Sequence, residues 1–461
     1  MEVAPQGRVV VACGAGNNGG DGYAAARLLR EKGREVLVLA AKPMAELSGD
    51  ALTQAERLPG DPPRPFAAAE LEGAAVVVDA LLGTGSAGEP RGPVGEAVAA
   101  IEACTAPVVA CDVPSGVDAS SGEIGGAATA AVATATFHAA KPGLHVEPGR
   151  SRAGDVRLID IGIPREAPVP AADVGLIDDE PLLAELPRRR AAWTKFTSGH
   201  VIVAGGSAGL VGAVVLASRA AARAGAGYVT ACVPGSQQPV AAAHLVEVMQ
   251  LAAPDDGGGA HTAEGVAAVL EALAAHSAVL VLGPGLGRAD GAQVFARELA
   301  QRAEGPLLLD ADALNAHAGR LAELAGRAVP AVLTPHAGEL GRLLGVESAE
   351  VERRRLHHAR AAAREAGAIV VLKGDDSLVA RPDGAVAVSP GASAGLATAG
   401  TGDVLSGIAG ALLARGVDPF TAACAAVRIH ARAGQSAARR LGVDGVIAGD
   451  VIDEIPAARP R

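Results

Sequence analysis

The chain has 461 residues, of which 49% are hydrophobic and 2% aromatic, and its formal net charge is −11. A chain of this length is expected to hold two or three domains, and its 60 glycines and 29 prolines indicate an α/β protein with many tight turns. The acidic balance and the scarcity of aromatic side chains argue against a nucleic-acid partner. Breaker residues interrupt every long apolar stretch, so no membrane span is expected.

The five cysteines have no C-x-x-C spacing and mostly lie in apolar segments. They are expected to be reduced and buried, as in cytoplasmic proteins. The first residues, "MEVAPQGRVVVACG", lack the basic start and the small-residue cleavage site of a signal peptide. We therefore expect a cytoplasmic protein.

Two regions alternate short apolar runs with helical stretches, which predicts a parallel sheet with helices on both faces in each of them. In the first region the runs lie at 9–12, 36–40, 75–78 and 108–110. In the second they begin at residue 200 and end at 372, followed by a hairpin over 378–388 and two closing helices. Residues rich in proline and charge separate the regions. The predicted domains are 1–165 and 193–461, with a linker over 166–192.

A glycine-rich segment, "GAGNNGGDG", follows the first apolar run. We interpret it as a loop before a helix over 23–32, in which glycine permits positive φ and close approach of a ligand. A dinucleotide-binding Rossmann unit would need an acid at the end of the second strand, and none is present there. Asn17, Asn18 and Asp21 instead lie inside the segment, which favours a ligand that needs oxygen donors. A glycine-rich turn without function is the alternative.

Two further strands end in acids: Asp79 in "VVVDALLGTG" and Asp112 in "CDVPSGVDA", which also contains Ser115. The carboxyl ends of parallel strands meet at one edge of a sheet, so these residues and Asn18 are expected to lie together. Oxygen ligands of this kind suit a hard cation. Asp112 is the acid–base candidate, with a pKa that burial would raise.

The second region carries "GTGDVLSG", in which residues 400–403 precede a helix over 404–413 whose first amides would face an anion. Asp403 could merely cap that helix, but the arrangement is also typical of ribokinase-like enzymes, in which such an aspartate deprotonates a hydroxyl that attacks a phosphate. Lys373, in "VVLKGDDS", offers a positive charge for a phosphate. No lysine lies in a Walker A sequence.

The first-region motifs "GNNGGDG", "DALLGTG" and "DVPSGVDA" resemble the NAD(P)H-hydrate epimerase domain, and the second region resembles the ADP-dependent NAD(P)H-hydrate dehydratase. The resemblance implies a Rossmann-like three-layer α/β/α domain followed by a ribokinase-like α/β domain. It also implies repair of hydrated NADH or NADPH. One domain interconverts the two epimers, and the other phosphorylates the hydroxyl from ADP and eliminates phosphate. A homo-oligomer is expected.

The resemblance also implies site residues. In the first domain, Asn18, Asp79 and Ser115 would bind K⁺, and Asp112 would act at the reacting carbon. The hydrate would contact Asn17, Asn18, Gly19, Gly20, Asp21, Gly83, Thr84, Gly85, Ser86, Ala87, Gly88, Glu89 and Asp112. In the second domain, ADP and Mg²⁺ are implied, with ADP contacts from Lys373, Gly374, Asp375, Asp376, Ser377, Ser393, Ala394, Gly395, Thr398, Gly400, Thr401 and Gly402. The hydrate would contact Gly285, His336, Ala337, Gly338, Glu339, Leu340, Gly341, Arg342 and the catalytic Asp403.

Two features depart from the pattern of these families. The acids Asp375 and Asp376 are unusual beside a diphosphate. The chain reaches its first core strand by Arg8, whereas the epimerase family has helices before this point. We therefore expect one face or edge of the first sheet to be uncovered, and epimerisation to be slow or absent.

Two alternatives remain open at this point. A ribokinase-like small-molecule kinase would share Asp403 and would leave the first domain as a non-catalytic ligand-binding module. A serine hydrolase would use Ser207 of "GGSAG" with Asp310 and His336, which follow one another in the chain order of α/β-hydrolases.

Overall fold

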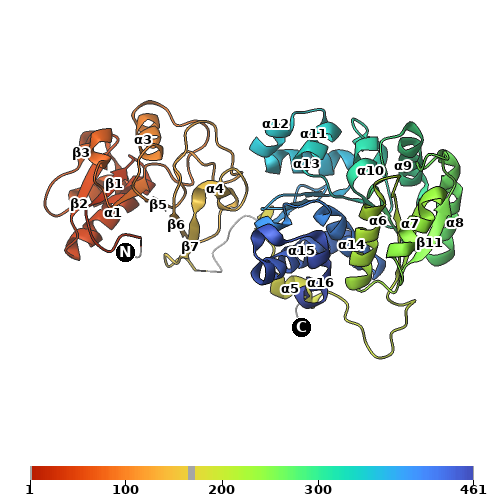
Figure 1. Cartoon of the computed structure of the whole chain (residues 1–461). Coiled ribbons are helices and arrows are strands. Elements are labelled where there is room, and N and C mark those ends of the chain that lie inside the picture. Colours follow the sequence, from red (N-terminus) through yellow and green to blue (C-terminus); the bar gives the residue numbers. More distant parts are fainter. Residues whose placement is uncertain (1–2, 165–171, 460–461) are drawn as a thin grey trace. The chain divides into compact units, whose positions relative to one another are not determined.

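The structure is a computed structural model that describes residues 3–164 and 172–459. The chain divides into two compact units, with the division at residues 171 and 172 (Figure 1). Within the described ranges, no helix combines the length and the apolar composition needed to cross a bilayer.

In the described part of the first unit, seven strands form one sheet in which all pairs are parallel. The predicted parallel sheet is therefore confirmed. The prediction missed three strands, at 64–65, 133–137 and 155–159. The first has only two residues, the second is mostly alanine and threonine, and the third contains two charged residues, Asp155 and Arg157. In sheet order the strands are β3 (Arg64–Pro65), β2 (Val36–Ala40), β1 (Val9–Cys13), β4 (Val76–Ala80), β5 (Val108–Cys111), β6 (Ala133–Phe137) and β7 (Asp155–Ile159).

Most valines of the central strands are buried, on both faces of this sheet, as expected for parallel strands that lie between helices. One face packs on α1 (Asn17–Glu31) and its neighbour α2 (Gly49–Glu56), and the other on α3 (Gly92–Glu102). A short helix, α4 (Arg150–Ala153), precedes β7. Together these form the predicted three-layer α/β/α arrangement.

Helix α1 begins at Asn17, six residues before the predicted start, so most of the glycine-rich segment is helix and not loop. None of its glycines has a positive φ, and they are needed for close packing instead. A Cβ on Gly22 would lie 2.6 Å from the Cβ of Ala80, and one on Gly19 only 1.9 Å from the carbonyl oxygen of Gly14. The glycines therefore let the helix start directly against the strand ends.

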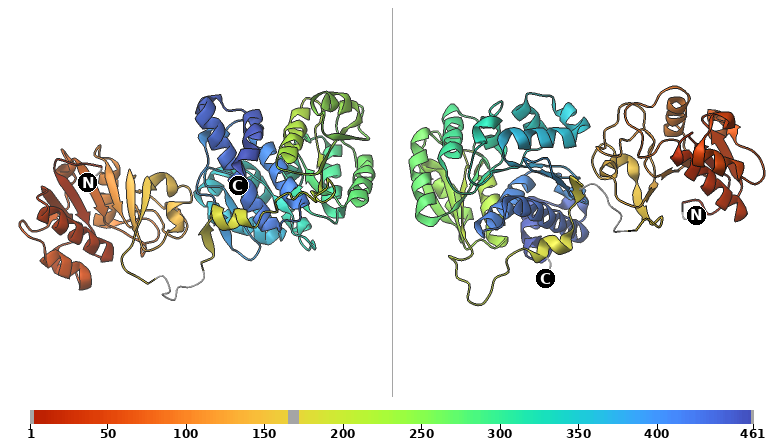
Figure 2. Two further views of the ribbon diagram at one scale, coloured as in Figure 1. Left: turned by 90° about the horizontal axis from the view of Figure 1, so that it is seen from below. Right: turned by 180° about the vertical axis from the view of Figure 1, so that it is seen from behind.

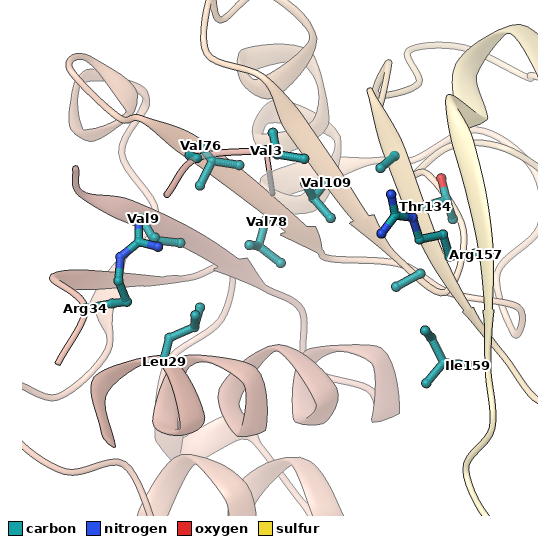
Figure 3. A pocket seen from close by; sticks show the side chains of 13 residues that line it. Val3, Val9, Leu29, Arg34, Val76, Val78, Val109, Thr134, Arg157 and Ile159 are labelled. Carbon is teal, nitrogen blue, oxygen red and sulfur yellow. The ribbon is translucent and has the colours of Figure 1, made fainter. Parts of the chain in front are cut away.

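Helix α1 covers only part of its face of the sheet. Beside it lies an apolar hollow of about 400 Å³. Figure 3 shows valines of β1, β4 and β5 lining this hollow, with Leu29 of α1 at one side and Arg157 of β7 at another.

The described part of the second unit holds a ten-stranded sheet. It is parallel except where β16 pairs with its two neighbours, so the predicted hairpin over 378–388 is confirmed. In sheet order the strands are β11 (Met249–Ala253), β10 (Tyr228–Pro234), β9 (His200–Ala204), β12 (Val279–Leu282), β13 (Leu307–Leu309), β14 (Val332–Leu333), β15 (Ile369–Leu372), β16 (Leu378–Ala380), β17 (Val386–Val388) and β8 (Val174–Leu176).

Helices cover both faces of this sheet, as Figures 1 and 2 show. One face packs on α6 (Val211–Arg223), α14 (Thr401–Ala414), α15 (Pro419–Leu441) and α16 (Ala448–Ala458). Three helices thus close the described chain where two were predicted. The remaining helices are α5 (Asp179–Ala184), α7 (Gln238–His244), α8 (Val266–His276), α9 (Asp290–Arg302), α10 (Ala311–Ala316), α11 (Ala337–Leu344), α12 (Ser348–Arg353) and α13 (Arg355–Ala366).

The predicted linker over 166–192 differs from the structure in its second half. Residues 165–171 lie outside the described residues. The following segment belongs to the second unit: β8 pairs in parallel with β17, and Asp179 of α5 accepts hydrogen bonds from the Arg428 guanidinium at 2.6 and 2.9 Å. Composition rich in proline and charge did not reveal this pairing, because β8 has only three residues.

Both sheets have a point where the chain order reverses. In the first sheet β1 lies between β2 and β4, and in the second β9 lies between β10 and β12. Ligands of open α/β sheets bind beyond the carboxyl ends of the strands at such points. The loops that carry the candidate residues leave the strands at these ends.

Candidate active sites

Asp79 lies at the end of β4 and is completely buried. Each of its carboxylate oxygens accepts two hydrogen bonds. Oδ1 accepts from the Ser115 hydroxyl at 2.6 Å and the Leu81 amide at 3.2 Å. Oδ2 accepts from the Ser115 amide at 2.8 Å and the Thr129 hydroxyl at 2.6 Å. Burial raises its pKa, and these bonds lower it in part. Asp79 therefore holds the loops after β4 and β5 together.

Asn18, in the first turn of α1, donates from Nδ2 to the Leu82 carbonyl at 2.7 Å. Its Oδ1 is buried and accepts no hydrogen bond from any described residue, a costly arrangement unless a ligand completes it. The Ser115 hydroxyl accepts one bond, from the Leu82 amide at 2.9 Å, and so retains a lone pair. The structure thus brings the three predicted cation ligands together.

A cation fits beside these three residues, but the role of Asp79 differs from the prediction. Both oxygens of Asp79 are fully engaged, so Asp79 would supply negative charge, and the oxygens of Asn18 and Ser115 would make the contacts. Such oxygen donors suit a hard cation. Among the described residues, no group of three or more His, Cys, Asp or Glu side chains could hold a metal ion, so a transition-metal centre finds no support.

Asp112 follows β5 in the left-handed region, with φ of +66°, a conformation that is uncommon outside glycine and often marks a functional site. Its Oδ2 accepts from the amide and hydroxyl of Thr84 at 2.9 and 2.5 Å, and its Oδ1 lies 2.8 Å from the Lys141 ammonium. Burial raises the pKa of Asp112, but the bonds from Lys141 and Thr84 outweigh it and leave the pKa lowered. The prediction of a raised pKa is wrong, because sequence reasoning missed Lys141.

A cavity of about 680 Å³ opens in front of these residues. Asp21 lines it too, and its pKa is raised by burial and by the negative charge of Asp112. Of the predicted hydrate contacts, Asn17, Asn18, Asp21, Gly83, Thr84, Gly85, Ser86 and Asp112 line this cavity. Five others do not: Gly19 and Gly20 are buried in α1, and Ala87, Gly88 and Glu89 lie outside the lining.

In the second unit, four charged side chains cluster at the ends of β13 and β15 and at the starts of α11 and α14. The Lys373 ammonium lies 3.0 Å from Asp310 and 3.6 Å from Glu339, and Asp310 accepts a further bond from Ser406 at 2.7 Å. Burial and the negative charges of Asp310 and Glu339 raise the pKa of Asp403 to about 8, against a smaller opposing effect of Lys373.

A second cavity, of about 560 Å³, lies on the side of α14 that faces α15 and the hairpin. It contains much of the predicted ADP site: Lys373, Gly374, Asp375, Ser377, Ser393, Ala394, Thr401 and Gly402 line it. Gly395, Thr398, Gly400 and Asp376 do not. Gly400 instead precedes α14 with φ of +89°, so it sets the direction of the helix start.

Asp376 is fully buried and forms an ion pair with the equally buried Arg355, at 3.0 and 2.8 Å. Its predicted ADP contact therefore finds no support, since the side chain lies in the interior and does not line the cavity. The pair of acids that looked unusual beside a diphosphate is thereby explained. One acid is neutralised by an arginine, and Asp375, which is exposed, accepts from the Ala392 amide at 3.1 Å.

The cavity has a side chain that sequence reasoning missed. His430 of α15 lines it and bonds the backbone of Thr401, while its Nε2 is buried and has no hydrogen-bond partner among the described residues. Burial lowers its pKa to about 4, so the ring is neutral near pH 7. The sequence "RIHARAG" gives no signal for this role, because a histidine at helical spacing is more often part of a core.

The predicted hydrate contacts of the second unit lie around the start of α11. His336 caps this helix, with its Nδ1 accepting from the amides of Gly338 and Glu339 at 3.0 and 3.3 Å. Arg342 donates to Asn315 at 2.7 Å. Gly285, after β12, accepts a bond from the Ser207 amide at 2.7 Å. Six predicted contacts lie within α11 (Ala337, Gly338, Glu339, Leu340, Gly341 and Arg342), and Leu340 is completely buried, so its contact with a hydrate finds no support.

The serine-hydrolase alternative is wrong, because each of its three side chains has a different partner. The Ser207 hydroxyl donates to the Gly285 carbonyl at 3.1 Å. Asp310 binds Lys373 and Ser406, and His336 serves as a helix cap. The geometry of a nucleophile with its base is therefore missing from these described residues.

Comparison with known proteins matches both units. The family described as NAD(P)H-hydrate dehydratase matches residues 201–457, and the family described as YjeF-related protein N-terminus matches residues 2–143. The bifunctional NAD(P)H-hydrate repair enzyme of Moorella thermoacetica is 40% identical over 460 residues, covering 97% of this chain and 87% of that protein. The protein of the same name from Escherichia coli is 35% identical, covering 97% and 84%.

Solved structures match the second unit. The ADP/ATP-dependent NAD(P)H-hydrate dehydratase of Bacillus subtilis, co-crystallised with ATP and Mg²⁺, is 28% identical with a TM-score of 0.54, and the match covers 62% of this chain and 98% of that one. A ribokinase-like superfamily protein of Enterococcus faecalis, 23% identical, has a TM-score of 0.54, with 63% and 97% covered. The ribokinase-like fold predicted for the second unit is thereby confirmed.

Proposed function

Because the chain belongs to the bifunctional NAD(P)H-hydrate repair enzymes, we propose that its two cavities carry the two halves of this repair. The first unit, assigned to residues 1–165, interconverts the epimers of hydrated NADH or NADPH. The second, assigned to residues 193–461 together with β8 and α5, dehydrates the hydrate with ADP. The match to the dehydratase family favours this function over a small-molecule kinase with the same aspartate.

The observation that carries the dehydratase assignment is the raised pKa of Asp403 in the first turn of α14, directly after Gly402, which lines the cavity. A general base works best when its pKa lies near the operating pH. We assign to Asp403 the removal of the proton from the hydroxyl of the hydrate, whose oxygen then attacks the β-phosphate of ADP. AMP leaves, and the subsequent loss of phosphate from the carbon that carried the hydroxyl and of a proton from the neighbouring carbon restores the double bond of the reduced nicotinamide.

The cavity supports the placement of ADP. The amides at the start of α14 suit a diphosphate, and Lys373, which lines the cavity, adds a positive charge. Its Asp310 and Glu339 partners hold the ammonium in place and raise its pKa against the effect of burial, so Lys373 stays charged. Mg²⁺, which accompanies ATP in the Bacillus subtilis structure, would bind with the diphosphate.

For the first unit we propose that the hydrate occupies the cavity between Asn17, Asp21, Thr84 and Asp112, and that Asp112 acts as the base. Its lowered pKa keeps it ionised near neutral pH. K⁺ would be held by Asn18 and Ser115, with Asp79 compensating its charge. We further propose a cytoplasmic protein that forms a homo-oligomer.

The test is to incubate the purified protein with an epimer mixture of hydrated NADH, with and without ADP, and to follow the absorbance of restored NADH. We expect repair only with ADP, fast for one epimer and slower for the other. Repair without ADP would contradict the dehydratase mechanism. Repair that stops when one epimer is consumed would contradict the assignment of the first unit.

A further inference from the structure

Lys141 lies in the loop after β6 and approaches Asp112 at the end of β5. Both side chains are largely buried, with exposed fractions of 14% and 13%. The three N–H groups of the ammonium have three acceptors: Asp112 Oδ1 at 2.8 Å, the Thr136 hydroxyl at 2.8 Å and the Phe137 carbonyl at 2.7 Å. An ammonium has only three donors, so none remains for a substrate.

The backbone makes the same kind of tight turn after β5 and after β6, close to Asp112 and Lys141. The neighbouring strands β5 and β6 are each followed directly by a residue with left-handed backbone, Asp112 with φ of +66° and His138 with φ of +63°. In each case the next amide bonds back to the carbonyl two residues earlier, at 2.8 and 2.7 Å. A conformation that is uncommon outside glycine therefore occurs twice where the two charged side chains meet.

Lys141 and Thr84 bind different oxygens of the Asp112 carboxylate. Lys141 binds Oδ1, and the amide and hydroxyl of Thr84 bind Oδ2. The other titratable groups near Asp112 are Asp21 of α1, Asp79 of β4 and the buried Cys111 of β5. None of them carries positive charge near neutral pH, so Lys141 is the cation among these groups.

We infer that Lys141 is a positioning residue for epimerisation, which fixes the orientation of the Asp112 carboxylate toward the cavity and keeps it ionised. The inference rests on the proposed function of the first unit. Lys141 is not itself the acid or the base, because its three donors are engaged and the residue does not line the cavity.

Two variants separate this role from proton transfer by Lys141. Arginine keeps the positive charge but cannot give up a proton in a protein. We therefore expect Lys141→Arg to retain epimerisation within about tenfold of the wild type. Loss of more than about a hundredfold, in protein whose first unit still melts as a folded domain, would overturn the inference, because it would show that Lys141 must transfer a proton.

Lys141→Met removes the charge. A neighbouring cation lowers an aspartate pKa by roughly 1–3 units, so the acid limb of the epimerisation rate should move up by about that much, with kcat affected more than KM. If the acid limb of the pH profile lies at the same pH in Lys141→Met as in the wild type, the inference is also overturned. Should Lys141→Met not fold, Lys141→Arg alone decides. Lys32→Met, an exposed lysine at the far end of α1, is the matched control. A wild type without epimerase activity would instead count against the proposed function.

Discussion

Replacing Asp403 by asparagine should stabilise the second unit, and more so at high pH. The folded protein holds this carboxyl with a pKa of about 8, raised from 3.8 mainly by burial and by Asp310. When the folded pKa is raised, stability is fully present below the unfolded pKa and is lost as the pH rises to the folded pKa. Asparagine keeps the shape and never ionises, so it avoids this loss.

The size of the effect follows from linkage. Between pH 6 and the folded pKa about two units remain, and each unit corresponds to about 1.4 kcal/mol. The advantage of Asp403→Asn should therefore grow by about 2–3 kcal/mol between pH 6 and pH 9, or about half of that if water screens the partly exposed side chain. For a unit of this size, the gap in melting temperature should widen by roughly 2–6 °C.

Differential scanning calorimetry of the ligand-free protein at the two pH values measures this gap. Asp375→Asn is the matched control, because Asp375 lines the same cavity but is exposed. The difference in melting temperature between Asp375→Asn and the wild type should be the same at both pH values. A gap for Asp403→Asn that is equal at both pH values would refute the reasoning. The same variant should lose ADP-dependent repair while it still binds ADP, and repair within tenfold of the wild type would contradict the role of Asp403 as the base.

Three further predictions concern other parts of the two units. His430→Phe should weaken ADP binding about five- to tenfold, since one hydrogen bond contributes about 1 kcal/mol, and isothermal titration calorimetry that finds equal affinity would count against a contact of Nε2 with the nucleotide. Potassium chloride, compared with choline chloride at equal ionic strength, should raise the melting temperature of the first unit in the wild type but not in Asn18→Ala; an equal rise in both would place the cation elsewhere. Asp376→Asn should lower the free energy of unfolding of the second unit by about 3–5 kcal/mol in urea, because it removes the negative charge beside the buried Arg355 guanidinium, and a loss below about 1 kcal/mol would show that this ion pair contributes little.

The parallel sheets and the clustering of Asn18, Asp79, Asp112 and Ser115 could be predicted from the sequence. Apolar runs identify buried parallel strands, and the carboxyl ends of such strands converge, so residues directly after them must lie close together. The same reasoning placed Lys373 and Thr401 at one cavity. These predictions needed only the order of the elements.

Partners far apart in the chain could not be predicted. Lys141 follows a strand made mostly of alanine and threonine that carried no signal, so the predicted direction of the Asp112 pKa shift was wrong. Arg355 is one of three consecutive arginines, and the pattern does not show that it pairs with Asp376. The start of α1 was misplaced for a different reason: glycine is unfavourable in helices, but here the close packing of Gly19 and Gly22 requires it.

The pairing of β8 with β17 bears on how the dehydratase half could be produced alone. A fragment that begins at residue 193, where sequence composition suggests a boundary, would lack both β8 and α5. It would leave the amide and carbonyl groups of β17 along that edge without their β8 partners, and unpaired strand edges of this kind promote aggregation. It would also remove the Asp179 carboxylate from Arg428, whose side chain is only 10% exposed. Expression of the half as a separate protein should therefore start before Asp173, whose carbonyl accepts a bond from the Val386 amide at 2.8 Å.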